Sequence, residues 1–239
     1  MKDHEINKAE LCQIIIRKMQ YWEATGADVI QNFWYKKLHS THEKTTDLIN
    51  KVLKNPELMP AYLTKGITYL IPKGKSSEDP AKYRPIACLC TLYKIITACI
   101  TKKINVHCEE QKIIAVQQKG CQKGSLGCKE QLLIDTVVTK QACKYKINLY
   151  SGCIDYAKAY DSVPHKWLAT VLKIYRIDER LITFLESTMR KWETTLILGR
   201  GDKRITIPTI KIRRGTFTTQ QIRHPTLLAA RGRGARRRR

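Results

Sequence analysis

The sequence predicts an α+β fold, and three observations support this prediction. Apolar residues recur at helical spacing near the N-terminus, long apolar stretches of helical length follow, and short strand-like runs bounded by turn residues lie between them. The 239 residues are 43% hydrophobic and 27% charged, which is enough apolar content and length to bury a core. This composition argues against disorder throughout the chain.

The charge of the chain is its least ordinary property. The formal net charge is +23, and residues 203–239 contain 12 Lys or Arg and no Asp or Glu. The rest of the chain is still basic without this tail. Clustered basic side chains displace counterions from a phosphate backbone, so a nucleic-acid partner is the first explanation, and a merely solvated basic surface is the second.

The nine cysteines predict reduced thiols in an intracellular compartment, nuclear or cytoplasmic, because an odd number occurs without an apolar leader. The sequence contains no run of about 18 apolar residues, so no membrane-spanning helix is expected. The candidate ligands of a zinc site are His107, Cys108, Cys121 and Cys128. These residues contain no CxxC pair, so ordinary thiols are expected.

The first half of the chain contains several expected elements. Residues 1–55 are rich in helix formers, with an amphipathic helix expected within residues 9–22. Residues 66–72 read as a strand followed by a lysine-bearing loop, residues 85–104 as a buried helix, and residues 124–142 as a glycine turn into a second helix.

The second half begins with a strand expected over residues 147–155, which places Asp155 at its carboxyl end. Helical spacing follows Pro164, and Asp178 is expected to be the N-cap of a further helix. Residues 194–198 and 204–212 predict a β-hairpin. Beyond residue 222 the sequence has low complexity and is expected to be disordered.

Four stretches occur in the order seen in one polymerase family. They are "LTKGITYLIPKGKSSEDPAKYRPIACLCTLYKI", "QQKGCQKGSLGCKEQLLID", "CIDYAKAYDSVPHKW" and "IKIRRGTF". Together they resemble the reverse transcriptases of non-LTR (LINE-type) retrotransposons over roughly residues 22–217. The resemblance implies a right-hand polymerase with fingers at 56–145 and a partial palm at 146–217. The residues themselves predict a helical N-terminal segment at 1–55 and a disordered basic tail at 218–239.

The resemblance also implies a metal site. Asp155 matches the first metal-binding aspartate of the family's palm, and the carbonyl of Tyr156 could add an oxygen ligand. Nucleotidyl transfer by two Mg²⁺ ions needs such hard oxygen ligands. A turn aspartate at a strand end is the alternative for Asp155. Asp161 is expected to cap or pair locally.

The other matched residues concern the nucleotide and the template. Arg84 and Lys73 resemble residues that grip the triphosphate, and Lys75 is a further candidate. Tyr160 matches the aromatic residue beneath the incoming sugar. For these positions a solvated loop or a core aromatic is the competing interpretation. Contacts to the template are implied for a glycine-rich stretch, which could equally be a simple turn: Gln118, Gly120, Gly124 and Ser125.

The match ends near Phe217, where the family continues with Gln-Gly-Asp and later an aromatic-x-Asp-Asp hairpin. No Asp or Glu follows Asp202 in these 239 residues. The resemblance therefore implies a truncated RNA-directed DNA polymerase whose partners would be an RNA template, a DNA primer and dNTPs, with no membrane involved. We expect this chain to be inactive alone. A non-catalytic basic RNA- or DNA-binding protein is the alternative.

Overall fold

The computed structural model describes residues 5–72, 74, 83–120, 124–156, 162–199, 205–212 and 214–215. Several predicted positions lie outside these residues: Lys73, Lys75, Tyr160, Asp161, Asp202 and the tail at 218–239. The chain divides into two compact units. The first contains Met1–His107 and Tyr160–Gln220, and the second contains Cys108–Ala159 and Gln221–Arg239.

The N-terminal segment of the first unit is helical, as predicted. It contains α1 (Lys8–Lys18), α2 (Asn32–Lys37) and α3 (His42–Lys54), with short 3-10 turns at His39–Thr41, Pro56–Leu58 and Ala61–Thr64. Asn7 and Glu10 form a capping box at the start of α1. Leu11 and Ile15 of α1 are fully buried, so its apolar stripe faces the core as the spacing predicted.

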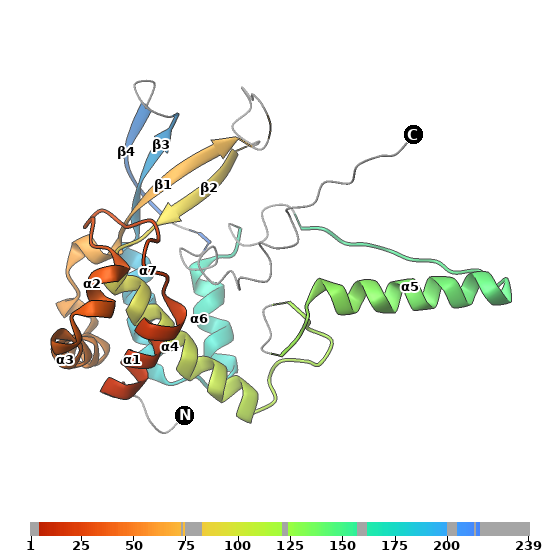
Figure 1. Cartoon of the computed structure of the whole chain (residues 1–239), viewed down its shortest axis with the longest axis horizontal. Helices are drawn as coiled ribbons and strands as arrows, with labels where there is room; N and C mark the ends of the chain where they lie inside the picture. Colours follow the sequence, from red (N-terminus) through yellow and green to blue (C-terminus); the bar gives the residue numbers. More distant parts are fainter. Residues whose placement is uncertain are drawn as a thin grey trace. The chain divides into compact units, whose positions relative to one another are not determined.

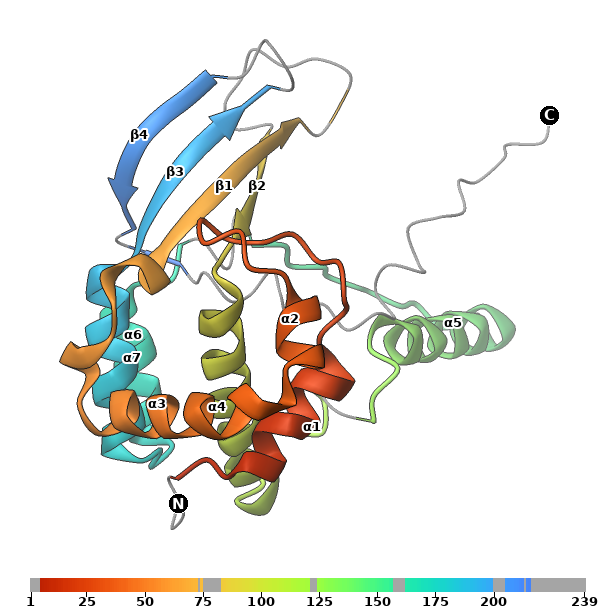
Figure 2. The same cartoon turned by 60° about the vertical axis from the view of Figure 1, so that its left-hand side comes forward.

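A four-stranded mixed sheet extends from the helical part of the first unit (Figures 1 and 2). Its strands are β1 (Lys65–Pro72), β2 (Tyr83–Cys88), β3 (Glu193–Leu198) and β4 (Ile205–Lys211), in the order β2-β1-β3-β4. β1 is antiparallel to β2 and parallel to β3, while β3 and β4 are antiparallel. Pro85 and Pro208 lie in β2 and β4, the two edges, where a residue without an N–H interrupts the fewest ladder bonds.

The predictions for the sheet were partly right. The strand at 66–72 and the hairpin over 194–212 are confirmed. The helix predicted over 85–104 is wrong at its start, because residues 83–88 pair with β1 and the helix α4 (Thr91–Glu110) begins after them. An apolar run does not by itself distinguish a short strand from a helix, and the adjacent β1 supplies the ladder partner.

Helices α6 (His165–Ile174) and α7 (Glu179–Lys191) confirm the predictions for the second half of the chain. The Asp178 carboxylate accepts a hydrogen bond from the Arg180 N–H, so it is the N-cap of α7. At the other end of α7, the buried Trp192 indole N–H donates to the Tyr93 hydroxyl of α4 at 2.8 Å. This bond joins the two helices within one core.

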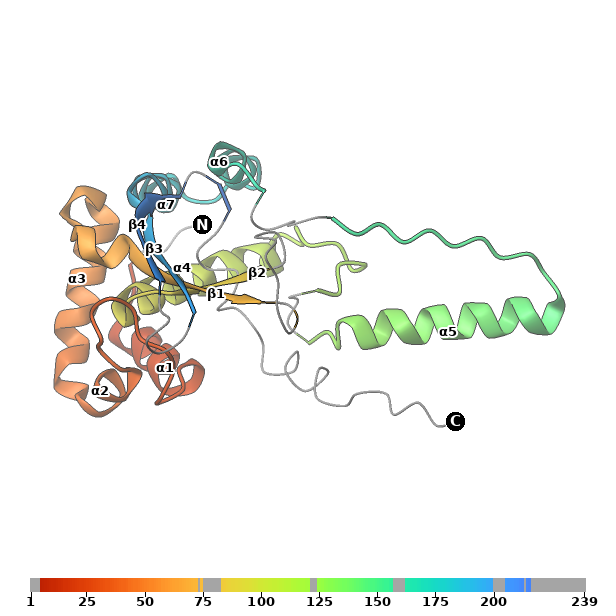
Figure 3. The same ribbon diagram turned by 90° about the horizontal axis from the view of Figure 1, so that it is seen from above.

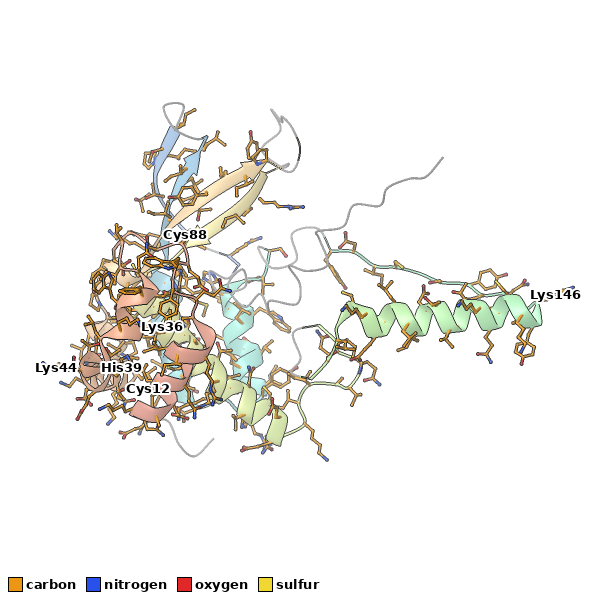
Figure 4. The ribbon with its side chains drawn as sticks, viewed as in Figure 1. Cys12, Lys36, His39, Lys44, Cys88 and Lys146 are labelled. Carbon is orange, nitrogen blue, oxygen red and sulfur yellow. The ribbon has the colours of Figure 1, made fainter. Side chains whose placement is uncertain are left out.

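The second unit contains α5 (Cys128–Tyr145), none of whose residues is buried. Lys146 adopts a left-handed conformation with φ of 52°, and its N–H bonds to carbonyls of the last turn (Figure 4). Residues 147–156 then run back past the helix (Figure 3), and the strand predicted at 147–155 is absent. A strand needs a neighbouring ladder, and no other described segment pairs with these residues.

No helix in the described part of the chain has both the length and the apolarity to span a membrane.

Candidate nucleotide-binding and catalytic site

Arg84 lies near the end of the β1–β2 hairpin. It is exposed on β2 and is paired across the ladder with Ile71, one position from the pair formed by Pro72 and Tyr83. Lys73, outside the described residues, follows Pro72 directly in the sequence. An exposed guanidinium on a fixed strand can donate two parallel hydrogen bonds to a phosphate, since its fork matches the spacing of phosphate oxygens.

The stretch that follows Asp161 is tied to the "RRG" stretch near the end of the match. Pro164 and Arg214 form an isolated antiparallel bridge, and the Gly215 N–H donates to the Val163 carbonyl at 2.9 Å. His165 Nε2 donates to the Gly215 carbonyl at 3.0 Å. Gly215 has a φ of +81°, a conformation that favours glycine. The structure thus brings two of the four matched stretches together.

Sequence reasoning missed the residues that anchor this junction. The His165 ring packs edge-on against Trp192, with ring centroids 5.3 Å apart and an interplanar angle of 87°. Trp192 in turn bonds to Tyr93 in the core, where burial raises the pKa of the Tyr93 phenol to about 12. The position of His165 directly after Pro164, at a helix start, was the only available signal. These contacts fix the start of α6 relative to α4.

In the second unit, Glu130 organises the glycine-rich stretch before α5. Its carboxylate accepts from the Leu126 N–H at 2.8 Å and pairs with Lys119 at 3.0 Å. The hydrogen bond from the Leu126 N–H lowers the pKa of Glu130 most, and the hydrogen bond from Lys119 lowers it further. Gly124 has a φ of +79° within this turn. These contacts fix Leu126 and Lys119 relative to the first turn of α5.

Gly120 lines an open groove of about 860 Å³ in the second unit, together with residues of α5 and Cys153. Gln118 is exposed nearby and donates its side-chain amide to the Gly120 carbonyl at 3.2 Å. Cys153 precedes Asp155 by two residues. The groove therefore places the glycine-rich stretch and the segment that leads to Asp155 on one surface. Gln118 and Gly124 are not part of its lining.

Asp155 and Tyr156 are both exposed, and Tyr156 retains 74% of its accessible surface. The Asp155 carboxylate and the Tyr156 carbonyl are hard oxygen donors of the kind Mg²⁺ accepts. Among the described residues, however, no three His, Cys, Asp or Glu side chains gather to hold a metal ion. One carboxylate does not fit a pair of divalent ions, which needs bridging ligands. The described residues therefore do not form a two-metal centre by themselves.

The central part of the chain matches a known protein family. The family model described as "Reverse transcriptase (RNA-dependent DNA polymerase)" matches residues 71–210, more than half of the chain. This range includes Arg84, the glycine-rich stretch, Asp155, all of β3 and all of β4 except its last residue, Lys211. The chain therefore belongs to the reverse transcriptase family.

Curated relatives show which branch of the family the chain resembles. It is 28% identical over 137 residues, 57% of its length, to a Pol polyprotein from the type-1 retrotransposable element R2 of Popillia japonica. It is 29% identical over 167 residues, 69% of its length, to a probable RNA-directed DNA polymerase from transposon X-element of Drosophila melanogaster. The aligned part covers 18% of each of these relatives. The predicted resemblance to non-LTR retrotransposon reverse transcriptases is confirmed.

Proposed function

We propose that the chain contributes the fingers and the first part of the palm to a retrotransposon enzyme that copies an RNA template into DNA. The family match over residues 71–210 is the observation that carries this proposal. The chain spans less than a fifth of the length of the curated relatives it matches. The activity, template, primer and dNTPs of those whole proteins therefore come to this chain as part of the proposal.

Each matched residue receives one role in this proposal. Arg84 and Lys73 bind the triphosphate of the incoming nucleotide, and Tyr160 lies beneath its sugar and rejects a 2′-hydroxyl. Gln118, Gly120 and Gly124 contact the template, while Asp155 and the Tyr156 carbonyl contribute ligands to Mg²⁺. The exposure of Arg84 and Asp155 and the open groove at Gly120 support these roles.

We further propose that the 239-residue chain does not polymerise by itself. Asp155 is a single carboxylate, and the sequence contains no Asp or Glu after Asp202 that could supply the aromatic-x-Asp-Asp ligands. The extended segment at 147–156 supports the same proposal, because it has no strand partner among the described residues. An extended segment without ladder hydrogen bonds does not hold the carboxylate of Asp155 in one geometry, as catalysis would require.

Nucleotide binding tests the triphosphate role independently of polymerisation. We expect the purified chain to bind a fluorescent dATP analogue, and Arg84→Ala to weaken this binding roughly 10- to 100-fold, the value of a charge-assisted hydrogen-bonded pair. Arg17→Ala, which removes an exposed arginine of α1, is the matched control and should leave binding unchanged. Equal binding by Arg84→Ala and the unmodified chain would rule out the role of Arg84.

A non-catalytic basic protein that binds RNA or DNA is the second candidate, favoured by the net charge of +23. Each neutralised phosphate releases about one counterion, so affinity should fall steeply with salt in either case. Nucleotide binding separates the two functions. A chain that binds RNA with a steep salt dependence but does not bind the dATP analogue would support the second function over the first.

A further inference from the structure

The loop between α1 and α2, together with α2 itself, presents four aromatic side chains near the surface of the first unit. We define the aromatic surface as Tyr21, Trp22, Phe33 and Trp34. Trp22 is stacked on Phe33, with ring centroids 5.4 Å apart and an interplanar angle of 14°, and Phe33 meets Trp34 edge-on at 5.3 Å. Trp22 and Trp34 nevertheless retain 72% and 53% of their accessible surface.

This exposure leaves one face of the Trp22 indole free. Phe33 covers the other face, so the outer face is a flat, rigid apolar surface of a size that matches a nucleobase. Two tryptophans held at the surface expose apolar area that a core would normally cover. A stacking partner from outside the chain would cover it.

The loop that carries the aromatic surface is fixed in place by a buried amide. Asn32 is 1% exposed, and its side-chain N–H groups donate to the Gln20 carbonyl at 2.7 Å and to the Glu23 carboxylate at 3.0 Å. The Thr91 hydroxyl of α4 donates to the Ile30 carbonyl at 2.6 Å. These bonds hold both ends of the loop, so little ordering would be needed when a partner binds.

A close backbone contact fixes the middle of the same loop. A Cβ atom added at Gly26 would lie 2.2 Å from the Cys90 nitrogen, so the loop rests directly on the backbone before α4. Lys94 of α4 also donates to the Ala24 carbonyl at 2.7 Å. The loop that carries the aromatic surface is therefore held against the start of α4.

The charge at the aromatic surface is positive. The ammonium group of Lys36 lies 4.4 Å from the centre of the Tyr21 ring, and that of Lys37 lies 5.8 Å from it (Figure 4 labels Lys36 on α2). The nearby Glu23 carboxylate accepts a hydrogen bond from Asn32 and keeps its single negative charge, which the two ammonium groups outnumber. Ammonium groups beside an exposed stacking face provide the two features that hold a single strand: phosphate attraction and base stacking.

We propose that the aromatic surface binds the unpaired bases of a single-stranded nucleic acid, with the outer face of Trp22 stacking on a base and Lys36 and Lys37 contacting its phosphates. This site lies outside the residues 71–210 that match the polymerase family, and it does not depend on the proposed polymerase function. A purely apolar protein partner is disfavoured, because two lysines would then be buried without acidic partners. A duplex is disfavoured because its bases already stack on one another.

The test uses the full chain and fluorescein-labelled 10-nucleotide oligo(U), with fluorescence anisotropy as the readout and neither dNTP nor Mg²⁺ present. We expect Trp22→Ala to weaken binding roughly 10-fold, since one base loses its stacking surface. Trp22→Phe, which keeps an aromatic face, should restore most of the affinity. Trp167→Ala is the matched control, because Trp167 is 57% exposed on α6 of the same unit, and it should bind like the unmodified chain.

The same binding measurement with other ligands distinguishes single-stranded nucleic acid from a duplex and from an acidic peptide. Oligo(dT) of the same length should lose affinity in Trp22→Ala as oligo(U) does, because every base offers a stacking face. An RNA duplex of the same length should be insensitive to Trp22→Ala. Equal affinity of Trp22→Ala and the unmodified chain for oligo(U) would overturn the proposal. So would an acidic peptide whose binding depends on Trp22 as strongly as that of oligo(U).

Discussion

We predict that the hydrogen bond between Trp192 and Tyr93, which joins α7 to α4, contributes measurably to the free energy of unfolding. The bond is 2.8 Å long, and the two residues are 3% and 0% exposed. Tyr93→Phe removes the acceptor of a buried indole N–H and keeps the volume of the ring. Leaving a buried polar group without this partner costs about 1–3 kcal/mol of unfolding free energy.

Urea unfolding followed by tryptophan fluorescence measures this loss. With a slope of about 2 kcal/mol per molar urea, a loss of 2 kcal/mol lowers the midpoint by about 1 M. Tyr62→Phe is the matched control, because Tyr62 is 52% exposed and its substitution should shift the midpoint little. Combining Tyr93→Phe with Trp192→Phe should give a coupling of about 1 kcal/mol. Equal urea midpoints for Tyr93→Phe and Tyr62→Phe would show that the Trp192–Tyr93 hydrogen bond does not stabilise the fold.

Three further predictions follow from the packing of the first unit. Gly26→Ala forces a Cβ to within 2.2 Å of the Cys90 nitrogen, and the resulting overpacking of about 1–3 kcal/mol should lower the melting temperature by several degrees in calorimetry. Asp178→Ala removes the N-cap of α7 and should cost about 1 kcal/mol in urea unfolding, whereas Asp178→Asn should cost less. Burial raises the pKa of Tyr93 from 10.0 to about 12, so the unfolded chain releases this proton first. Stability should therefore fall as the pH rises from 10 to 12, and Tyr93→Phe should make that fall smaller in urea midpoints measured across this range.

In the first unit, a helix or hairpin could be predicted from the sequence wherever its own residues include the capping or turn residues that end it. Asp178 before an amphipathic run predicted α7, and the turn residues between two strand-like runs predicted the β3–β4 hairpin. The order β2-β1-β3-β4 could not be predicted in this way. The parallel pairing of β1 with β3 joins residues more than a hundred positions apart. Only the folded chain brings them together.

The wrong predictions share one physical cause, which is that strands depend on their neighbours. Residues 85–88 looked helical but lie beside β1, which draws them into the ladder. Residues 147–155 looked like a strand but have no ladder partner among the described residues. Apolar content predicted burial in both cases and could not identify the partner.

Residues of the candidate site could be predicted only where a short sequence motif contains the side chain that would bind nucleotide or metal. Arg84 and Asp155 were named from the resemblance, and the structure shows both exposed. The contact of His165 with Gly215 and Trp192 was not predictable, because it joins residues distant in sequence. The aromatic surface was missed for another reason. Its rings come from a loop and a six-residue helix, which give no long periodic pattern.

Primer extension by a longer protein tests the central claim most directly. The 239-residue chain, joined to the residues that follow the aligned part of the R2 Pol polyprotein from Popillia japonica, should extend a DNA primer on an RNA template when Mg²⁺ is present. Asp155→Asn in this fusion should abolish the product, and the 239-residue chain alone should give none. Extension that persists in the Asp155→Asn fusion, or that the 239-residue chain performs alone, would contradict the account.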